Sequence, residues 1–251
     1  MSSTLSNYNF LPSFEEFRER AKNTTLSLNE KCGFTETFRS GQSARIFSDI
    51  CSKLTVLAKP GVKFLDIGAG CTELAHHIVE TTGQHRQSLT VIDSPEMLSL
   101  LPDRPHVTRI EGAFPHCVEN IVHTLGTFDA ILAYSVVQSV FRDSNLFAFV
   151  DFAVQLLSDQ GQFLIGDIPN ATMRKRFMVS ASGKAYHKHH YSDLPEPAVL
   201  FNMLEPGQLD DGVILGLIAR MRTAGFHAFV LPQGADLPMA TRREDILIVR
   251  V

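Results

Sequence analysis

From residue 62 to the end of the chain, apolar strand-like segments alternate with amphipathic helical segments. Short, mostly apolar runs are followed by stretches in which apolar residues recur every three or four positions. Because parallel strands need a crossover between them, this alternation is typical of a mostly parallel sheet with helices on both faces. The predicted strands cover Val62–Ile67, Ser88–Asp93, Val107–Glu111, Phe128–Tyr134, Gln162–Asp167, residues 226–231 and Asp245–Val251.

The last predicted strand follows a polar loop instead of a helix. It therefore pairs most simply antiparallel with the strand before it, and one antiparallel edge is common in such sheets. The sequence thus predicts a doubly wound, Rossmann-like α/β fold with seven strands, mostly parallel, and an antiparallel last strand.

The chain divides into two predicted parts. Residues 1–58 are predicted to form an N-terminal helical cap, in which Ser13 and Glu16 have the spacing of a capping box. Residues 59–251 are predicted to form the α/β domain. Within it, residues 183–210 are rich in Pro, His, Asp and Gly without a clear period, which indicates an insertion or lid. Further helices are predicted at residues 42–57, 74–79, 117–125, 144–158, 170–174 and 211–224.

The charge balance restricts the partners. The formal net charge is −4, and a basic excess is usual in proteins that bind nucleic acid, so we expect no nucleic-acid partner. No apolar run approaches eighteen residues and no signal peptide is apparent, so we expect no membrane span and a cytoplasmic location. The sequence leaves open whether the chain forms a homodimer.

Cysteine spacing argues against a zinc site or a disulfide framework. Cys32, Cys51, Cys71 and Cys117 lie far apart and include no C-x-x-C pair. This pattern is typical of reduced thiols in a cytosolic protein.

Acids and glycines mark the ends of the first two predicted strands. Gly68 and Gly70 follow Asp66 and allow a tight turn that brings backbone close to a ligand. Asp93 ends the second strand, where a carboxylate can accept hydrogen bonds from both hydroxyls of a ribose. This order favours an adenosine-type ligand over an ordinary strand-to-helix turn.

The residue at position 73 discriminates between two such ligands. Dinucleotide-binding folds have a third glycine there, and a helix N-terminus faces the pyrophosphate. Here the position is Glu73, whose carboxylate would repel a pyrophosphate. S-adenosylmethionine carries no phosphate and meets no such obstacle.

Five segments resemble motifs of the class I S-adenosylmethionine-dependent methyltransferases. They are, in order, Phe64–Gly70, Val91–Asp93, Glu111–Phe114, Phe128–Ser135 and Leu157–Ile165. The resemblance extends over residues 62–170. It departs from the family at Thr72, where a third glycine is common, and in the third motif, which lacks the usual acid. The segments GDIPN, MRKRF and LPMATRRED are in addition similar to methyltransferases of bacterial surface-sugar gene clusters.

The resemblance implies S-adenosyl-L-methionine as cofactor and no metal. It implies methyl transfer to an oxygen or nitrogen of a small polar acceptor, with a sugar- or nucleotide-linked acceptor left open. An NAD(P)-dependent oxidoreductase and a non-catalytic S-adenosylmethionine-binding module are the alternatives. In similar enzymes N-terminal helices close over the cofactor, where Arg39 could reach its carboxylate. The implied cofactor-binding residues are Asp66, Gly68, Ala69, Gly70, Asp93, Ser94, Met97, Ala113, Phe114, Tyr134 and Ser135.

Three residues are candidates for the chemistry itself. Tyr134 ends the fourth strand and is expected beside the transferred methyl group. Asp167 ends the fifth strand and could act as a base, orient one or cap the next helix. His187 is the candidate general base among the clustered histidines, because imidazole titrates near neutral pH. A metal is not expected there, since the histidine spacing is poor for three ligands and no cysteine accompanies it.

Acceptor contacts are predicted from polar residues beyond the strand ends. The arginines among them suit an anionic group on the acceptor, with solvation or ion pairs to Glu244 or Asp245 as the alternative. Asn170 could instead cap a helix. The predicted acceptor-binding residues are Gln138, Asn170, Arg174, Arg242 and Arg243.

Overall fold

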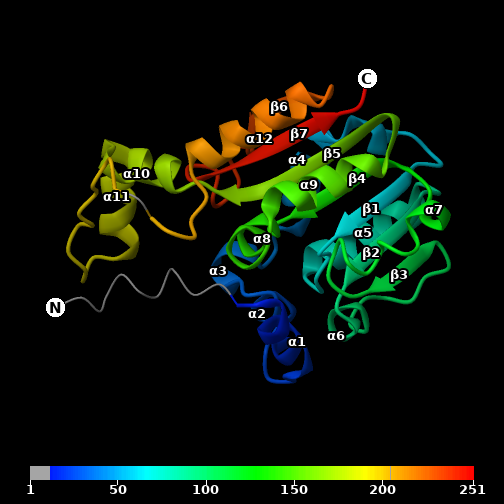
Figure 1. Ribbon diagram of the computed structural model, residues 1–251. Helices are drawn as coiled ribbons and strands as arrows, with labels where there is room; N and C mark the ends of the chain where they lie inside the picture. Colours follow the sequence, from blue (N-terminus) through cyan, green and yellow to red (C-terminus); the bar gives the residue numbers. More distant parts are fainter. Residues whose placement is uncertain (1–11, 204) are drawn as a thin grey trace.

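A seven-stranded sheet in the order β3-β2-β1-β4-β5-β7-β6 forms the centre of the protein (Figure 1). The structure is a computed structural model that describes residues 12–203 and 205–251. All seven predicted strands are confirmed. They are β1 (Lys63–Ile67), β2 (Ser88–Asp93), β3 (Val107–Glu111), β4 (Phe128–Tyr134), β5 (Leu157–Pro169), β6 (His227–Pro232) and β7 (Arg243–Val249).

The strand directions confirm the predicted antiparallel last strand. β1 to β5 run parallel, and β7 is antiparallel to both of its neighbours, β5 and β6. β7 begins two residues earlier than predicted, because Arg243 pairs with Pro169 at the extended end of β5. The chain thus returns from β6 and inserts its last strand into the sheet.

Most helices begin at a residue whose side chain accepts a backbone hydrogen bond from the first turn. The capping box predicted at Ser13 and Glu16 is present, and Ser27 with Glu30 forms a second one. The helices are α1 (Phe14–Lys22), α2 (Leu28–Lys31), α3 (Glu36–Arg39), α4 (Ser43–Lys53), the 3-10 helix η2 (Thr55–Ala58), α5 (Glu73–Gln84), α6 (Pro95–Leu98), α7 (Val122–Leu125), α8 (Val137–Asp143), α9 (Leu146–Gln155), α10 (Ala171–Val179), α11 (Ala181–His190) and α12 (Asp211–Thr223).

Helices cover both faces of the sheet. Successive side chains of a strand point to opposite faces. Phe64 therefore packs with α4 and α5 on one face, while its neighbour Leu65 packs with α9 and α12 on the other. The strand ends that carry the polar residues remain at the edge between these two apolar layers.

Several predicted helices differ from the structure. Residues 117–121 form turns, because the apolar spacing reflects burial of Val118 against the sheet and not a helical face. The segment 183–210 was predicted to contain no helix, yet its first residues, up to His190, belong to α11. Most residues of α11 are exposed, so its sequence carries no apolar period. The helix predicted over 144–158 spans only α9, and α8 was not predicted.

The helices α1 to α3 lie against one end of the sheet, α4 covers one of its faces, and α10 and α11 extend away from it (Figure 1). Lys31 joins the first two helices, since its ammonium group donates a 2.7 Å hydrogen bond to the Ala21 carbonyl at the end of α1. Arg18 joins α1 to the domain through two 2.9 Å hydrogen bonds to Glu96 on α6. No helix in the described part of the chain is long and apolar enough to cross a membrane.

Candidate functional site

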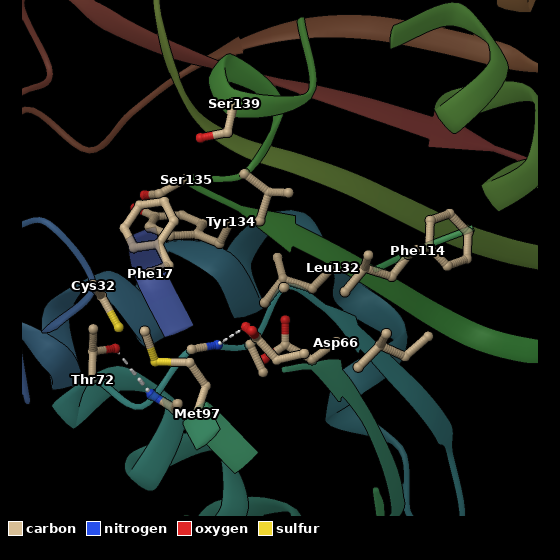
Figure 2. A pocket seen from close by; sticks show the side chains of 18 of the residues that line it. Phe17, Cys32, Asp66, Thr72, Met97, Phe114, Leu132, Tyr134, Ser135 and Ser139 are labelled. Carbon is tan, nitrogen blue, oxygen red and sulfur yellow. Dashed lines mark hydrogen bonds between the residues drawn. The ribbon is translucent and has the colours of Figure 1, made fainter. Parts of the chain in front are cut away.

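A cavity of about 400 Å³ lies beyond the carboxyl ends of β1, β2 and β4 (Figure 2). This is the place where the strand order reverses between β1 and β4, at which ligands bind in open α/β sheets. The N-terminal helices form one wall of the cavity, and the loop after β1 forms another. The residues from the N-terminal part of the chain that line it are Phe14, Phe17, Asn29, Cys32, Phe34, Arg39, Ser43 and Ile46.

The two glycines of the loop after β1 are required by their protein neighbours. Gly68 has a φ of +71°, and a Cβ there would lie 2.6 Å from a methyl group of Val136. Gly70 has a φ of +62°, and a Cβ there would lie 2.9 Å from the Cys32 sulfur. The close approach that the sequence predicted for a ligand is thus already made by other parts of the chain.

The backbone N–H groups of this loop point back to β2. Gly68 and Ala69 both donate to the Ile92 carbonyl, over 2.8 and 3.3 Å. Gly70 donates to the Asp93 carboxylate over 2.8 Å. In dinucleotide-binding folds such groups face the pyrophosphate. Here they have partners within the protein, which argues against a phosphate-bearing ligand at this loop.

Asp66 and Asp93 bring two carboxylates to the cavity, and neither forms an ion pair with a cationic side chain of the described residues. Burial, reinforced by the charge of Asp93, raises the pKa of Asp66 to about 7. Burial also raises the pKa of Asp93 to about 6, although the N–H groups of Ser94 and Gly70 counteract it. Each carboxylate can therefore gain stability from the donors of a neutral ligand.

Asp167, at the end of β5, has the opposite environment. Its carboxylate is only 2% exposed and accepts hydrogen bonds from Arg39, Arg243 and the Ser135 hydroxyl. Burial alone would raise its pKa, but the two guanidinium groups outweigh it and hold the pKa below its usual value. Asp167 is therefore ionised and fully engaged.

Of the charged residues Arg39, Asp167 and Arg243, Arg39 is the one that lines the cavity. Its guanidinium lies 4.0 Å from the ring centroid of Phe34 and 5.6 Å from that of Tyr134. It also donates a 2.9 Å hydrogen bond to the Ser135 hydroxyl. Two aromatic rings and two polar partners thus contact the guanidinium group.

The chain is similar to the plantazolicin methyltransferase BpumL in complex with SAH, with 15% identity, a TM-score of 0.57, and coverage of 95% of this chain and 96% of that chain. It is also similar to the N-methyltransferase NodS from Bradyrhizobium japonicum WM9 in complex with S-adenosyl-l-homocysteine, with 13% identity, a TM-score of 0.56, and coverage of 94% and 97%. The chain has the class I methyltransferase fold.

The methyltransferase domain of bacterial CtHen1 shares this fold with 12% identity, a TM-score of 0.53, and coverage of 83% of this chain and 98% of that chain. No protein-family model and no curated protein matches the sequence. The resemblance predicted from the motifs is confirmed, and at these identities the comparisons establish the class I methyltransferase fold alone.

Ten of the eleven predicted cofactor-binding residues line the cavity. Ser94 does not, because its hydroxyl accepts a hydrogen bond from the Met97 N–H and caps α6. Figure 2 shows Phe114 and Thr72 on opposite sides of the cavity. The predicted residues that line it are Asp66, Gly68, Ala69, Gly70, Asp93, Met97, Ala113, Phe114, Tyr134 and Ser135.

His187 lies away from this cavity. It is buried on α11 beside a smaller cavity of about 180 Å³, and its Nε2 lies 3.2 Å from the Leu194 carbonyl oxygen. The histidines are on a helix, not on the loop expected from the sequence. This location gives His187 no contact with the main cavity.

The five predicted acceptor-binding residues also lie outside the lining of the cavity. Asn170 caps α10, as the alternative prediction had it, and its amide group donates to Asp211 over 2.7 Å. Arg174 lies 3.5 Å from Glu205. Gln138 donates to the Ser135 carbonyl.

The two arginines after β6 have partners other than those expected. Arg243 bonds Asp167, not Glu244 or Asp245, and Arg242 donates to the Tyr186 hydroxyl over 3.0 Å. Arg242 also lies 6.0 Å from the ring centroid of Phe38, the neighbour of Arg39.

Sequence reasoning did not find the aromatic wall of the cavity. Phe14, Phe17 and Phe34 come from the N-terminal part, and no local motif marks them. Val136, Val137, Val140 and Phe141 have helical spacing after β4, a signal that could have revealed α8 and its cavity residue Ser139.

Proposed function

We propose that the protein is an S-adenosylmethionine-dependent methyltransferase that moves a methyl group to an oxygen or nitrogen of a small polar acceptor. The observation that carries the proposal is the carboxylate of Asp93. It lies beside a glycine loop whose N–H groups are already bonded, and no cationic side chain of the described residues pairs with it, although Arg39 lines the same cavity. This combination suits the neutral hydroxyls of a ribose and not a phosphate.

The residues present fit such a cofactor. Asp93 would hold the ribose, and Met97 and Phe114 offer apolar contacts for the adenine. Arg39 would bind the carboxylate of the methionine part, since its guanidinium lines the same cavity. When bound, the cofactor supplies an electrophilic methyl group on a positively charged sulfur.

Tyr134 and Ser135 are proposed to border the acceptor. Burial and the negative charge of Asp167 raise the pKa of Tyr134 well above its usual value, so its hydroxyl remains protonated and can donate a hydrogen bond. Asp167 has its lone pairs engaged by cations and is therefore a poor proton acceptor. An amine that arrives uncharged needs no strong base, so nitrogen suits the site at least as well as oxygen.

Arg242 is proposed to meet an acidic group on the acceptor. Its guanidinium lies 6.0 Å from the ring centroid of Phe38, the neighbour of Arg39, and donates to the Tyr186 hydroxyl. A sugar- or nucleotide-linked acceptor would carry such a group. Arg242→Ala is expected to raise the KM for an acidic acceptor at least tenfold without changing cofactor affinity.

The oxidoreductase alternative has less support. The dinucleotide-binding fold has strand order 3-2-1-4-5-6, whereas here an antiparallel strand lies between β5 and β6. The N–H groups of Gly68 and Ala69 in the loop after β1 also donate to the Ile92 carbonyl and so are not available to bind a pyrophosphate. A non-catalytic binding module would share the cofactor site, and only turnover separates it from an enzyme.

Calorimetric titration with S-adenosylmethionine, S-adenosylhomocysteine and NADH tests the proposal. We expect binding of the first two, no binding of NADH, and a loss of at least tenfold in affinity in Asp93→Ala. Asp103→Ala is the matched control, since the Asp103 side chain is 98% exposed, and it should bind like the wild type. NADH binding without a response to S-adenosylmethionine would overturn the proposal.

A further inference from the structure

Two cysteines face each other where the N-terminal helices meet the loop after β1. Cys32 ends α2, and Cys71 precedes α5 by two positions. Their sulfur atoms are 3.7 Å apart, although the residues are 39 positions apart in sequence. The Cys71 N–H also points at the Cys32 sulfur over 3.3 Å.

The two thiols differ in their access to solvent. Cys71 is completely buried, whereas Cys32 is partly exposed and lines the cavity. Figure 2 shows Cys32 on the same side of the cavity as Thr72, which begins the helix after the loop. A small reagent that enters the cavity can therefore reach the Cys32 sulfur.

The helices α1 to α3 are held to the rest of the domain by several separate contacts. The apolar contact is a small cluster around Ala21, Cys71 and Met97, separate from the two main cores. The polar contacts include ion pairs of Arg18 and Lys22 with Glu96 and of Arg39 with Asp167. The Arg142 guanidinium also donates to the Pro12 carbonyl, and the Gly41 N–H donates to Glu73. These helices form one wall of the cavity. A ligand would therefore exchange most readily when their contacts with the loop after β1 and with α6 open.

We propose that Cys32 and Cys71 form a redox-sensitive pair whose disulfide locks the N-terminal helices onto the loop after β1 and so slows ligand exchange. The proposal concerns regulation of the same site and rests on the proposed function for the nature of the ligand. Closing the bond needs the sulfur atoms to move from 3.7 Å to about 2.05 Å.

The chemistry requires a hydroperoxide as oxidant. The hydrogen bond to Cys71 and burial raise the pKa of the Cys32 thiol, so Cys32 must first lose its proton to solvent in the cavity. Its thiolate then attacks one peroxide oxygen, the O–O bond breaks, and Cys32 becomes a sulfenic acid while an alcohol or water leaves. The Cys71 thiolate then attacks the Cys32 sulfur, the S–S bond forms, and hydroxide leaves. The two thiol protons end on the leaving oxygens, so two thiols and one peroxide give one disulfide and, for hydrogen peroxide, two waters.

The surroundings of Cys71 favour its role in the second step. A hydrogen bond from the Cys32 thiol lowers the pKa of Cys71 and stabilises its thiolate. The position of Cys71 just before the N-terminus of α5 acts in the same direction.

Hydrogen peroxide treatment of the full-length protein, followed by peptide mapping, tests the bond directly. We expect one disulfide linking the peptides of Cys32 and Cys71, absent in Cys32→Ser and in Cys71→Ser. A Cys51→Ser and Cys117→Ser double variant should form it like the wild type. Absence of this bond in the wild type, or an equal yield of other pairings, would overturn the proposal.

Two further measurements test the lock. Release of radiolabelled S-adenosylhomocysteine should slow at least tenfold on oxidation and recover with dithiothreitol. Amide hydrogen exchange of residues 12–39 in the unliganded protein should slow by a similar factor, and this readout needs no cofactor. A disulfide that forms but leaves hydrogen exchange unchanged would overturn the proposal that it holds the helices in place. A reduced protein that binds neither S-adenosylmethionine nor S-adenosylhomocysteine would overturn only the proposed function.

Discussion

Asp66 and Asp167 end two strands of the same sheet and are about equally buried, at 3% and 2% exposure, yet their environments are opposite. Asp66 and its neighbour Asp93 face the cavity without a cation, and burial raises their pKa values. Asp167 is held between two arginines and has a lowered pKa.

The difference indicates that Asp66 is available to bind a ligand, whereas Asp167 stabilises the folded structure. A buried acid without partners costs free energy, and such costs concentrate at functional sites. A buried acid with two cations contributes to structure, because loss of it would leave those cations unpaired.

Replacement of Asp167 should have the largest effect on stability. Asp167→Ala leaves Arg39 and Arg243 without their shared partner, and we expect the free energy of unfolding to fall by about 3–5 kcal/mol. Urea denaturation measures it. Asp151→Ala is the matched control, because the surface pair of Asp151 with Arg220 should contribute less than about 1 kcal/mol. If Asp167→Ala lowered the free energy of unfolding no more than Asp151→Ala does, Asp167 would not have the stabilising role assigned to it.

Replacement of Asp66 should have the opposite sign. Its folded-state pKa of about 7 lies above the ordinary value of 3.8, so ionisation destabilises the folded protein as the pH rises through this range. Asp66→Asn should therefore increase the free energy of unfolding at pH 8 by on the order of 4 kcal/mol, with the gain vanishing below about pH 4. Denaturation at both pH values checks it, and Asp103→Asn should show no such trend. A destabilised variant at pH 8 would contradict the assignment.

The loop beside these acids should respond to a single methyl group. Gly70→Ala introduces strain at positive φ and a contact with the Cys32 sulfur, and we expect a loss of about 2 kcal/mol. Gly61→Ala has a similar φ but open space around it, so its loss should be about 1 kcal/mol. Adding Cys32→Ala to Gly70→Ala should recover the difference. Equal losses in the two single variants would show that the sulfur contact is unimportant.

Cofactor binding should report the protonation of Asp93. Its carboxylate must be ionised to accept two hydroxyl hydrogen bonds, and its pKa is about 6. Affinity for S-adenosylhomocysteine should therefore fall as the pH drops below about 6, up to tenfold per pH unit. Calorimetry at several pH values measures it. In Asp93→Asn the same series should be weak throughout and flat; a slope that survives there would assign the titration to another group.

The sequence predicted the part of the site that one continuous segment builds. Asp66, Gly68, Gly70 and Asp93 lie at strand ends that local apolar patterns reveal, and parallel strands bring these ends to one edge. The fold followed from the same patterns. These signals lie within about thirty residues of each other, so no tertiary knowledge was needed.

The rest of the site depends on how distant segments dock. Arg39 meets Asp167 across 128 positions, and no spacing rule marks either as the other's partner. His187 was a candidate base because of its chemistry, but a mostly exposed helix carries it to another cavity. Arg243 was expected at the rim, yet burial of Asp167 draws its guanidinium inward.

The place of β7 between β5 and β6 has a consequence for how the molecule is assembled. Neither β5 nor β6 has a hydrogen-bonding neighbour on that side until residues 243–249 arrive. During synthesis both strands would present unpaired backbone on that side until residues 243–249 have been made. Deletion of residues 242–251 should therefore yield insoluble material, even though none of the deleted residues lines the cavity.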